Sequence, residues 1–224
     1  MRKLKRVSAL FTLLLFLGNI SFAQKLRNHK TGPDRKFGIF MNTLSLLEIQ
    51  QAAIGAGINY KIAHRWDTSL ELNYLFDGFM QAADDYNSQG YRGIITLKRF
   101  SKSRVFFYGL DLRLKYFSFS DKREFKNETT GDTLYNFKHD AANTLFGVAG
   151  ITGVRLPISR NKKWAFEFNT GIGIKLRTVT RKNIPAGYEY FNNDMSRHYN
   201  YTTGQDISGE TPYFPTAVRI MYFF

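Results

Sequence analysis

The chain has 224 residues, a formal net charge of +14 and no cysteine. The lack of cysteine excludes a disulfide scaffold and a lipid-anchored lipoprotein. The positive charge is compatible with two kinds of partner, nucleic acid or the anionic phosphates of a membrane surface.

The first 23 residues predict a secretory signal peptide. Basic residues open the chain, an apolar run covers 9–17, and Ser21-Phe22-Ala23 supplies small residues before cleavage at Gln24. The apolar run is far shorter than the roughly 20 residues of a spanning helix. Export makes nucleic acid an unexpected partner and favours membrane phosphates. Residues 24–36 are polar and predict a periplasmic lead-in.

Period-two alternation then recurs along the chain, because successive side chains of a strand point to opposite faces. In 104–119 the apolar residues Phe106, Tyr108, Leu110 and Leu112 alternate with a face that holds glycine and charge. The sixth strand is the least regular. The predicted strands cover about 37–46, 49–62, 67–78, 90–100, 104–119, 143–156, 164–178 and 213–224.

The predicted connections differ in length at the two ends of these strands. Short turns at 63–66, 101–103 and 157–163 alternate with polar loops at 80–89, 120–141 and 180–212. Short periplasmic turns and longer external loops are typical of outer-membrane barrels. The sequence therefore predicts an all-β fold for 37–224, an eight-stranded antiparallel up-and-down transmembrane β-barrel.

The crowded face of each predicted strand is apolar, and the other face holds glycines and charges. An eight-stranded barrel has interior room for about one layer of side chains. We therefore expect the apolar face to contact lipid, with aromatic residues at both strand ends as interfacial girdles. No later stretch predicts a spanning helix, so a membrane-embedded chain must be a barrel.

The chain resembles the small outer-membrane β-barrel proteins of gram-negative bacteria, the OmpA/OmpX-like size class. The resemblance covers about 37–224, and the run 42–66 also resembles a barrel family of unknown function. It implies a location in the outer membrane and recognition of the last strand by the barrel-assembly machinery. The implied assembly signal consists of Val218, Ile220, Tyr222 and Phe224.

Charged side chains fall on the predicted lumen face and must pair or meet water there. We interpret them as a structural salt-bridge network that closes the lumen; a gated ion path or a small-ligand site is the alternative. The predicted network consists of Glu71, Asp111, Glu167, Lys98, Arg113, Lys175, Arg177 and Arg219.

An enzyme acting on lipid A or phospholipid at the external rim is an alternative function. It would need a nucleophile and a base, and His139 with Asp140 and Ser118 or Ser120 is one such set. His198 with Ser196 is the other. We assign no catalytic residue, and we expect neither a metal nor a cofactor.

The loop 180–212 combines tyrosines with Asn, Gly and Thr, a composition that suits recognition surfaces. Its predicted contact residues are Tyr188, Tyr190, Phe191, Tyr199 and Tyr201. The expected partners are outer-membrane lipid and lipopolysaccharide, with an unidentified surface ligand. The sequence thus predicts a porin-like envelope protein with a structural or adhesive role; a secreted lipocalin-like carrier is a further alternative.

Overall fold

The computed structural model describes residues 33–43, 51–77, 89–190 and 208–224, and the regular structure in these residues is β-strand. The strands are β1 (Phe37–Asn42), β2 (Gln51–Ala63), β3 (Trp66–Asp77), β4 (Gln89–Phe100), β5 (Phe106–Asn127), β6 (Thr133–Pro157), β7 (Trp164–Lys182), β8 (Tyr188–Tyr190), β9 (Gly209–Tyr213) and β10 (Thr216–Phe223). The described residues contain no helix with the length and apolar character needed to cross a membrane. The predicted signal peptide and most of the lead-in lie outside the described residues.

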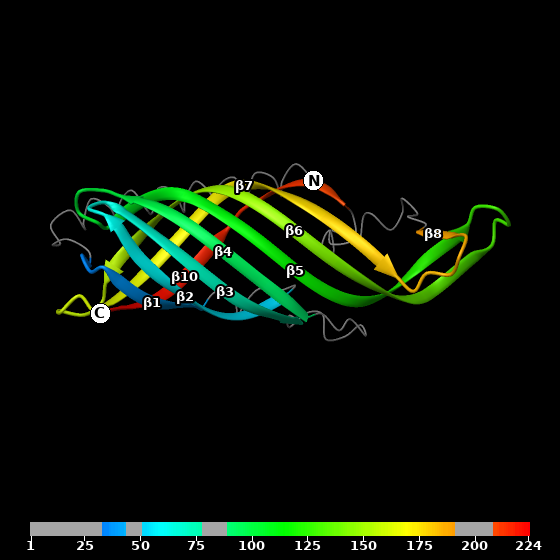
Figure 1. Cartoon of the computed structure of the whole chain (residues 1–224), viewed down its shortest axis with the longest axis horizontal. Coiled ribbons are helices and arrows are strands. Elements are labelled where there is room, and N and C mark those ends of the chain that lie inside the picture. The colour runs from blue at the N-terminus through cyan, green and yellow to red at the C-terminus, as the bar shows by residue number, and fades with distance from the viewer. Residues whose placement is uncertain (1–32, 44–50, 78–88, 191–207) are drawn as a thin grey trace, which may run out of the picture. The chain divides into compact units, whose positions relative to one another are not determined.

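Eight of the strands form a closed ring of antiparallel neighbours (Figure 1). The order is β10, β1, β2, β3, β4, β5, β6, β7, and the ring closes where β10 pairs with β7. The N–H of Phe224, just after β10, donates to the carbonyl of Phe37 at 3.1 Å and so extends the pairing of β10 with β1. The predicted all-β class and the ring of eight antiparallel strands are confirmed.

The short connections 64–65, 101–105 and 158–163 lie at one end of the ring, which we call the short-turn end (Figure 1). Phe37 and Phe224 lie there too. We call the opposite end the hairpin end, because β5 and β6 continue there beyond the part of β6 that pairs with β7. The predicted loop 80–89 lies outside the described residues except for its last residue, and 191–207 of the predicted loop 180–212 lie outside them too.

The prediction of a loop at 120–141 is wrong. β5 continues to Asn127, β6 begins at Thr133, and the two strands stay paired from Ser120 opposite Asp140 to Lys126 opposite Thr133. The buried ring of Phe125 holds this extension together, with its centroid 5.8 Å from that of Phe137. The polar side chains that suggested a loop are tolerated because a two-stranded ribbon leaves much of both faces in contact with solvent.

The predicted loop 180–212 also contains regular structure. β8 pairs with β5, and β9 pairs with β7 alongside residues 173–177. The prediction of an uninterrupted loop there is therefore wrong, and 191–207 lie outside the described residues. The two strands are only three and five residues long, too short for an alternating pattern to be visible in the sequence.

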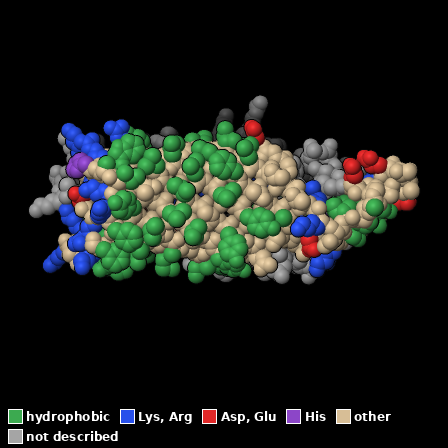
Figure 2. Space-filling model, in the orientation of Figure 1, with side chains coloured by type: hydrophobic (Ala, Val, Ile, Leu, Met, Phe, Trp, Pro, Cys, Tyr) green, Lys and Arg blue, Asp and Glu red, His purple; other side chains and the backbone are tan. Residues whose placement is uncertain are grey.

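Side chains alternate between the interior and the exterior of the ring, as the period-two pattern predicts. The exterior carries the apolar side chains: Leu72 is 63% exposed and Leu112 is 43% exposed. The interior carries charges, and Lys98 and Glu167 are both 0% exposed. Figure 2 shows apolar side chains over the visible face of the ring and a cluster of Lys and Arg at the short-turn end.

The irregular pattern of β6 has a simple explanation. Leu145 and Ile151 are out of phase with the exposed Phe146 and Val148 because they face the interior. Ile151 packs there against Phe100, Phe107 and Ala149. The interior is therefore mixed, with apolar clusters between the charged groups.

One interior glycine makes room for an aromatic ring. A Cβ at Gly57 would lie 2.2 Å from Cζ of Phe40, a ring that is only 3% exposed, and 2.5 Å from the carbonyl oxygen of Leu70. Both neighbours are held by the packed interior, so neither yields without strain.

We expect Gly57→Ala to destabilise the chain by about 1–3 kcal/mol through overpacking. Gly150→Ala is the matched control, because a Cβ there meets nothing within 4 Å, and its effect should stay within about 0.5 kcal/mol. Denaturant titration of the folded, purified chain measures both. Equal unfolding curves for the two variants would show that Gly57 is not a tight site.

Candidate functional site

The interior near the short-turn end is organised around the carboxylate of Glu167 on β7. This group accepts hydrogen bonds from Nζ of Lys98 at 2.7 Å, from Nε of Arg155 at 2.9 Å and from Nη1 of Arg219 at 3.0 Å. All four side chains are at most 2% exposed. Lys98, Arg155 and Arg219 come from β4, β6 and β10, so this one carboxylate connects four strands across the ring.

Two further carboxylates help to neutralise the buried cations. Arg155 donates to Oδ2 of Asp67 at 2.6 Å, and Arg219 donates to Oε2 of Glu71 at 2.7 Å. Both acceptors lie on β3 and are almost completely buried. Each guanidinium therefore bridges two carboxylates, which is the arrangement that best offsets the loss of water around a buried charge.

Neutral amides complete the network, which we call the ion network. Asn42 on β1 donates to Oε1 of Glu71 at 2.9 Å, and the carbonyl of Asn59 on β2 accepts from Arg155 at 3.0 Å. Seven of the eight ring strands thus contribute a side chain to it, with β5 excepted. The ion network consists of Asn42, Asn59, Asp67, Glu71, Lys98, Arg155, Glu167 and Arg219.

Aromatic rings and one more arginine close the short-turn end around the ion network. The guanidinium of Arg155 lies 4.5 Å from the centroid of Phe100 and 5.3 Å from that of Phe223, within cation–π range. Arg104, in the connection between β4 and β5, donates to Oδ1 of Asp67 at 2.8 Å and to the carbonyl of Pro33 at 3.2 Å. These contacts cover the ion network at the short-turn end.

An exposed ion pair lies outside this seal. Lys61 donates a hydrogen bond to Asp34, and Nη1 of Arg104 lies 3.3 Å from the same carboxylate. The hydrogen bond from Lys61 lowers the pKa of Asp34, with a smaller contribution from Arg104. Asp34 therefore stays ionised down to lower pH than a free aspartate.

Four of the eight predicted network residues meet in the ion network: Glu71, Glu167, Lys98 and Arg219. The structure places the other four nearer the hairpin end. Asp111 accepts from Oγ1 of Thr96 at 2.6 Å and from Nη2 of Arg113 at 3.5 Å. Arg113, Lys175 and Arg177 are half-buried interior side chains, and the charge of Asp111 still acts on Arg219 of the ion network.

The sequence interpretation missed Arg155, which donates to Glu167, Asp67 and Asn59, one partner more than Arg219 has. Its signal was present, because Arg155 alternates with Val154 and Leu156 in a predicted strand. Asp67 was also missed, because it is the first residue of the predicted strand 67–78. Its position in the alternation nevertheless places it on the same face as Glu71. Arg104 was assigned to the start of the predicted strand 104–119, in phase with Phe106 on the apolar face, but β5 begins only at Phe106 and Arg104 lies in the preceding turn, with φ of 56°.

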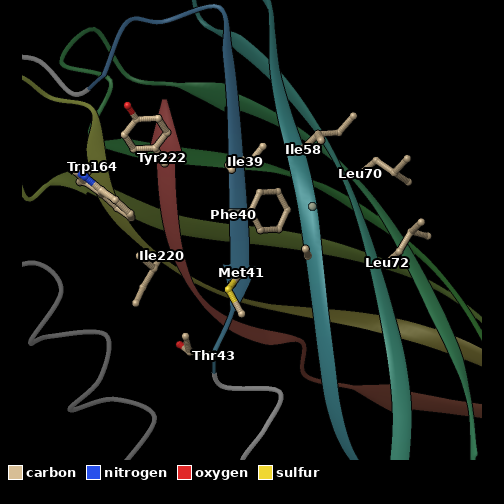
Figure 3. Close-up of a pocket in the computed structure, with 12 residues that line it drawn as sticks. Ile39, Phe40, Met41, Thr43, Ile58, Leu70, Leu72, Trp164, Ile220 and Tyr222 are labelled. Atoms are coloured by element: carbon tan, nitrogen blue, oxygen red, sulfur yellow. The ribbon is translucent and has the colours of Figure 1, made fainter. Parts of the chain in front are cut away.

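A hollow lies in the apolar exterior of the ring (Figure 3). Ala56 is the small residue responsible, because it lies between Met41 and Leu72 in the paired strands. The hollow measures about 620 Å³ and its lining is almost entirely apolar. Its labelled lining residues are Ile39, Phe40, Met41, Thr43, Ile58, Leu70, Leu72, Trp164, Ile220 and Tyr222.

The candidate catalytic set at His139 is not assembled. His139 is 3% exposed and packs edge-on against Phe125 at 5.0 Å. Ser120 donates instead to Oδ1 of Asp140 at 2.7 Å, and both lie on the opposite face of the ribbon from His139. Neighbouring strand residues cannot share a face. The second set, His198 with Ser196, lies outside the described residues.

The remaining predicted residues occupy the ends of the fold. Val218, Ile220, Tyr222 and Phe224 all point outward from β10 or its end, as an exposed apolar row. Tyr188 and Tyr190 belong to β8, which pairs with the β5 extension. Phe191, Tyr199 and Tyr201 lie outside the described residues.

No His, Asp or Glu cluster that could hold a metal occurs within the described ranges. Comparison with known proteins adds no assignment: no protein-family model matches the chain, and no curated protein is significantly similar to it. The ring itself is therefore the basis on which a function can be assigned.

We expect Glu167→Gln to destabilise the chain by about 3–5 kcal/mol, because it leaves buried cations without their shared counter-charge. Glu210→Gln on the exposed strand β9 removes the same charge from solvent and should change stability by less than about 0.5 kcal/mol. Denaturant titration of the full chain compares the two. If Glu167→Gln unfolds like Glu210→Gln, the ion network does not hold the ring together.

Proposed function

We propose that the chain is an outer-membrane β-barrel whose exterior contacts lipid and whose lumen is closed by the ion network. Its role on this proposal is structural or surface-interacting, and not that of an open pore. The observation that carries the proposal is the exterior of the ring, which is apolar on every strand.

Each ring strand contributes exposed, large apolar side chains to this exterior. Examples in ring order are Ile39, Ile58, Leu72, Ile95, Leu112, Phe146, Ile174 and Ile220, all at least 41% exposed. A soluble monomer rarely exposes a contiguous apolar patch larger than a few hundred Å². A continuous apolar exterior around a closed ring is instead the surface that a bilayer stabilises.

Aromatic residues at the margins of the apolar exterior support the same proposal. Trp164 and Tyr222 pack together at the short-turn end with centroids 5.0 Å apart, and Tyr74 and Tyr91 pack at 5.6 Å towards the hairpin end. On β5, the exposed tyrosines 108 and 116 are eight residues apart, or about 26 Å along a strand. With a tilt of roughly 40°, the band is about 20 Å high, close to the ~25 Å of outer-membrane barrels.

The interior supports a closed lumen rather than a carrier or a channel. A lipocalin-like carrier needs an apolar cavity, whereas this interior holds ionised side chains at the short-turn end. The ion network spans the ring there, and its members are nearly or completely buried. Ions could cross only after several buried ion pairs had separated.

The hairpin end supports the surface-interaction part of the proposal. The β5–β6 extension stands beyond the apolar band, and Tyr135 on it is 71% exposed. β8 adds a third strand to this extension. If the short-turn end faces the periplasm, as the resemblance to small outer-membrane barrels implies, this extension and its tyrosines project from the cell surface. Lipid and lipopolysaccharide are then its nearest partners.

The arrangement of His139, Ser120 and Asp140 gives no support to the alternative of a lipid-modifying enzyme. The β10 row that includes Val218 and Ile220 is compatible with recognition by the barrel-assembly machinery, because it is outward-facing and apolar.

We expect Leu112→Arg to impair folding into phosphatidylcholine vesicles by about 2–4 kcal/mol, because it places a charge near the middle of the apolar band. Tyr135→Arg is the matched control, since residue 135 is exposed but lies on the extension. The folded fraction is read from electrophoretic mobility in detergent with and without heating.

The wild-type chain should show a mobility shift on heating, as closed barrels resist unfolding by detergent until heated. A wild-type chain without any shift would count against membrane insertion. Equal vesicle folding by Leu112→Arg and Tyr135→Arg would count against the apolar band as the lipid contact.

A further inference from the structure

On the hairpin side of Asp111, basic side chains outnumber acidic ones among the described residues in the interior of the ring. Two neighbouring rows of paired positions cross β4, β5, β6 and β7 there. In the first row, Gly147 on β6 lies between Lys175 on β7 and Arg113 on β5. In the second row, Leu145 on β6 lies between Arg177 on β7 and Lys115 on β5, and Arg92 on β4 pairs with Lys115. Five basic side chains thus occupy two adjacent rows, with Asp111 as the neighbouring carboxylate in the row before them.

Arg113, Lys175 and Tyr213 converge on the space above Gly147. The guanidinium of Arg113 lies 5.5 Å from the ring centroid of Tyr213. The hydroxyl of Tyr213 reaches over Gly147, because a Cβ at 147 would lie 3.1 Å from that oxygen. Lys175 is near enough to Arg113 and Arg177 for their charges to repel its own.

Donor groups in this space are left unused by the protein. The buried hydroxyl of Tyr213 and the buried Nε of Arg113 have no hydrogen-bond partner among the described residues. A buried donor without a partner costs free energy, and so do adjacent like charges. An anion placed between Arg113 and Lys175 would relieve both costs at once.

We propose that Arg113, Lys175 and Tyr213 form a binding site for a phosphate-type oxyanion inside the ring. A guanidinium, an ammonium and a phenol offer several donors to such an anion, and Asp111 engages only Nη2 of Arg113, at 3.5 Å. Arg177 and Lys115 add positive potential from the next row. Gly147 keeps the space open, since any side chain there would press on Tyr213.

The site is accessible in a way that the ion network is not. The side chain of Arg113 is 17% exposed, whereas the side chains of Lys98 and Glu167 are 0% exposed. Tyr213 packs against the apolar cluster of Phe100, Phe107, Ala149 and Ile151, which forms the floor of the site on the side of the ion network. An anion therefore approaches from the hairpin side, and the site does not depend on membrane insertion.

The test is titration calorimetry on the folded full chain in a neutral detergent. The first probe is inorganic phosphate; the second is phosphatidic acid in mixed micelles, with diacylglycerol as its uncharged reference. Lys175→Gln and Arg113→Gln each remove one charge of the site, and Tyr213→Phe removes only the hydroxyl. Lys102→Gln, in an exposed turn of the short-turn end, is the matched charge control.

We expect binding that weakens about tenfold or more in Lys175→Gln and Arg113→Gln, by a smaller factor in Tyr213→Phe, and not in Lys102→Gln. Saturation with inorganic phosphate supports a free anion as ligand, and saturation with phosphatidic acid alone supports a lipid headgroup. Absence of binding by both probes overturns the proposal. The proposal is also overturned if Tyr213→Phe binds with wild-type affinity and if Lys102→Gln loses as much affinity as Lys175→Gln and Arg113→Gln do.

Discussion

A closed ring of eight strands forces every second side chain into a narrow interior, and the pairing of charges there is the constraint on which the structure depends. Glu167 meets this constraint by accepting from three cations of three other strands. Arg155 and Arg219 lie opposite Glu167 on the strands next to β7, and the contact with Lys98 crosses the interior to β4. The strands are therefore connected through the centre as well as through their edges. A buried ion pair contributes little net free energy, but a broken one is costly. The ion network therefore specifies which strands face one another.

The same constraint inverts the usual arrangement of a folded protein. The interior holds charges and amides between small apolar clusters, while the exterior holds large apolar side chains on every ring strand. This inversion is costly in water and favourable in lipid, and it is the physical basis for the proposed place of the chain in a membrane. The hollow at Ala56 fits this setting, because a fluid acyl chain fills a gap of irregular shape without a specific contact.

The interior is also graded from one end of the ring to the other. Acids and bases are balanced at the short-turn end, where Arg104 and Phe100 complete the seal. Basic residues dominate in the rows of Arg113 and Arg177. Beyond them the β5–β6 extension leaves the ring. A sealed end, a basic interior and a protruding ribbon suit a protein that meets its ligands from one side only.

Much of this was readable from the sequence, because alternation is a local property. Period two assigns each side chain to one of two faces, so the strands, their pairing class and the charged face followed from residues alone. Glu71, Lys98, Glu167 and Arg219 were found in this way. The β5–β6 extension was not, because its polar residues resemble those of a loop. Which charges meet was decided only by the tertiary structure. Closure of the ring brings Asp67 and Arg155 together although they are far apart in the sequence, and no local pattern encodes contacts between residues so far apart.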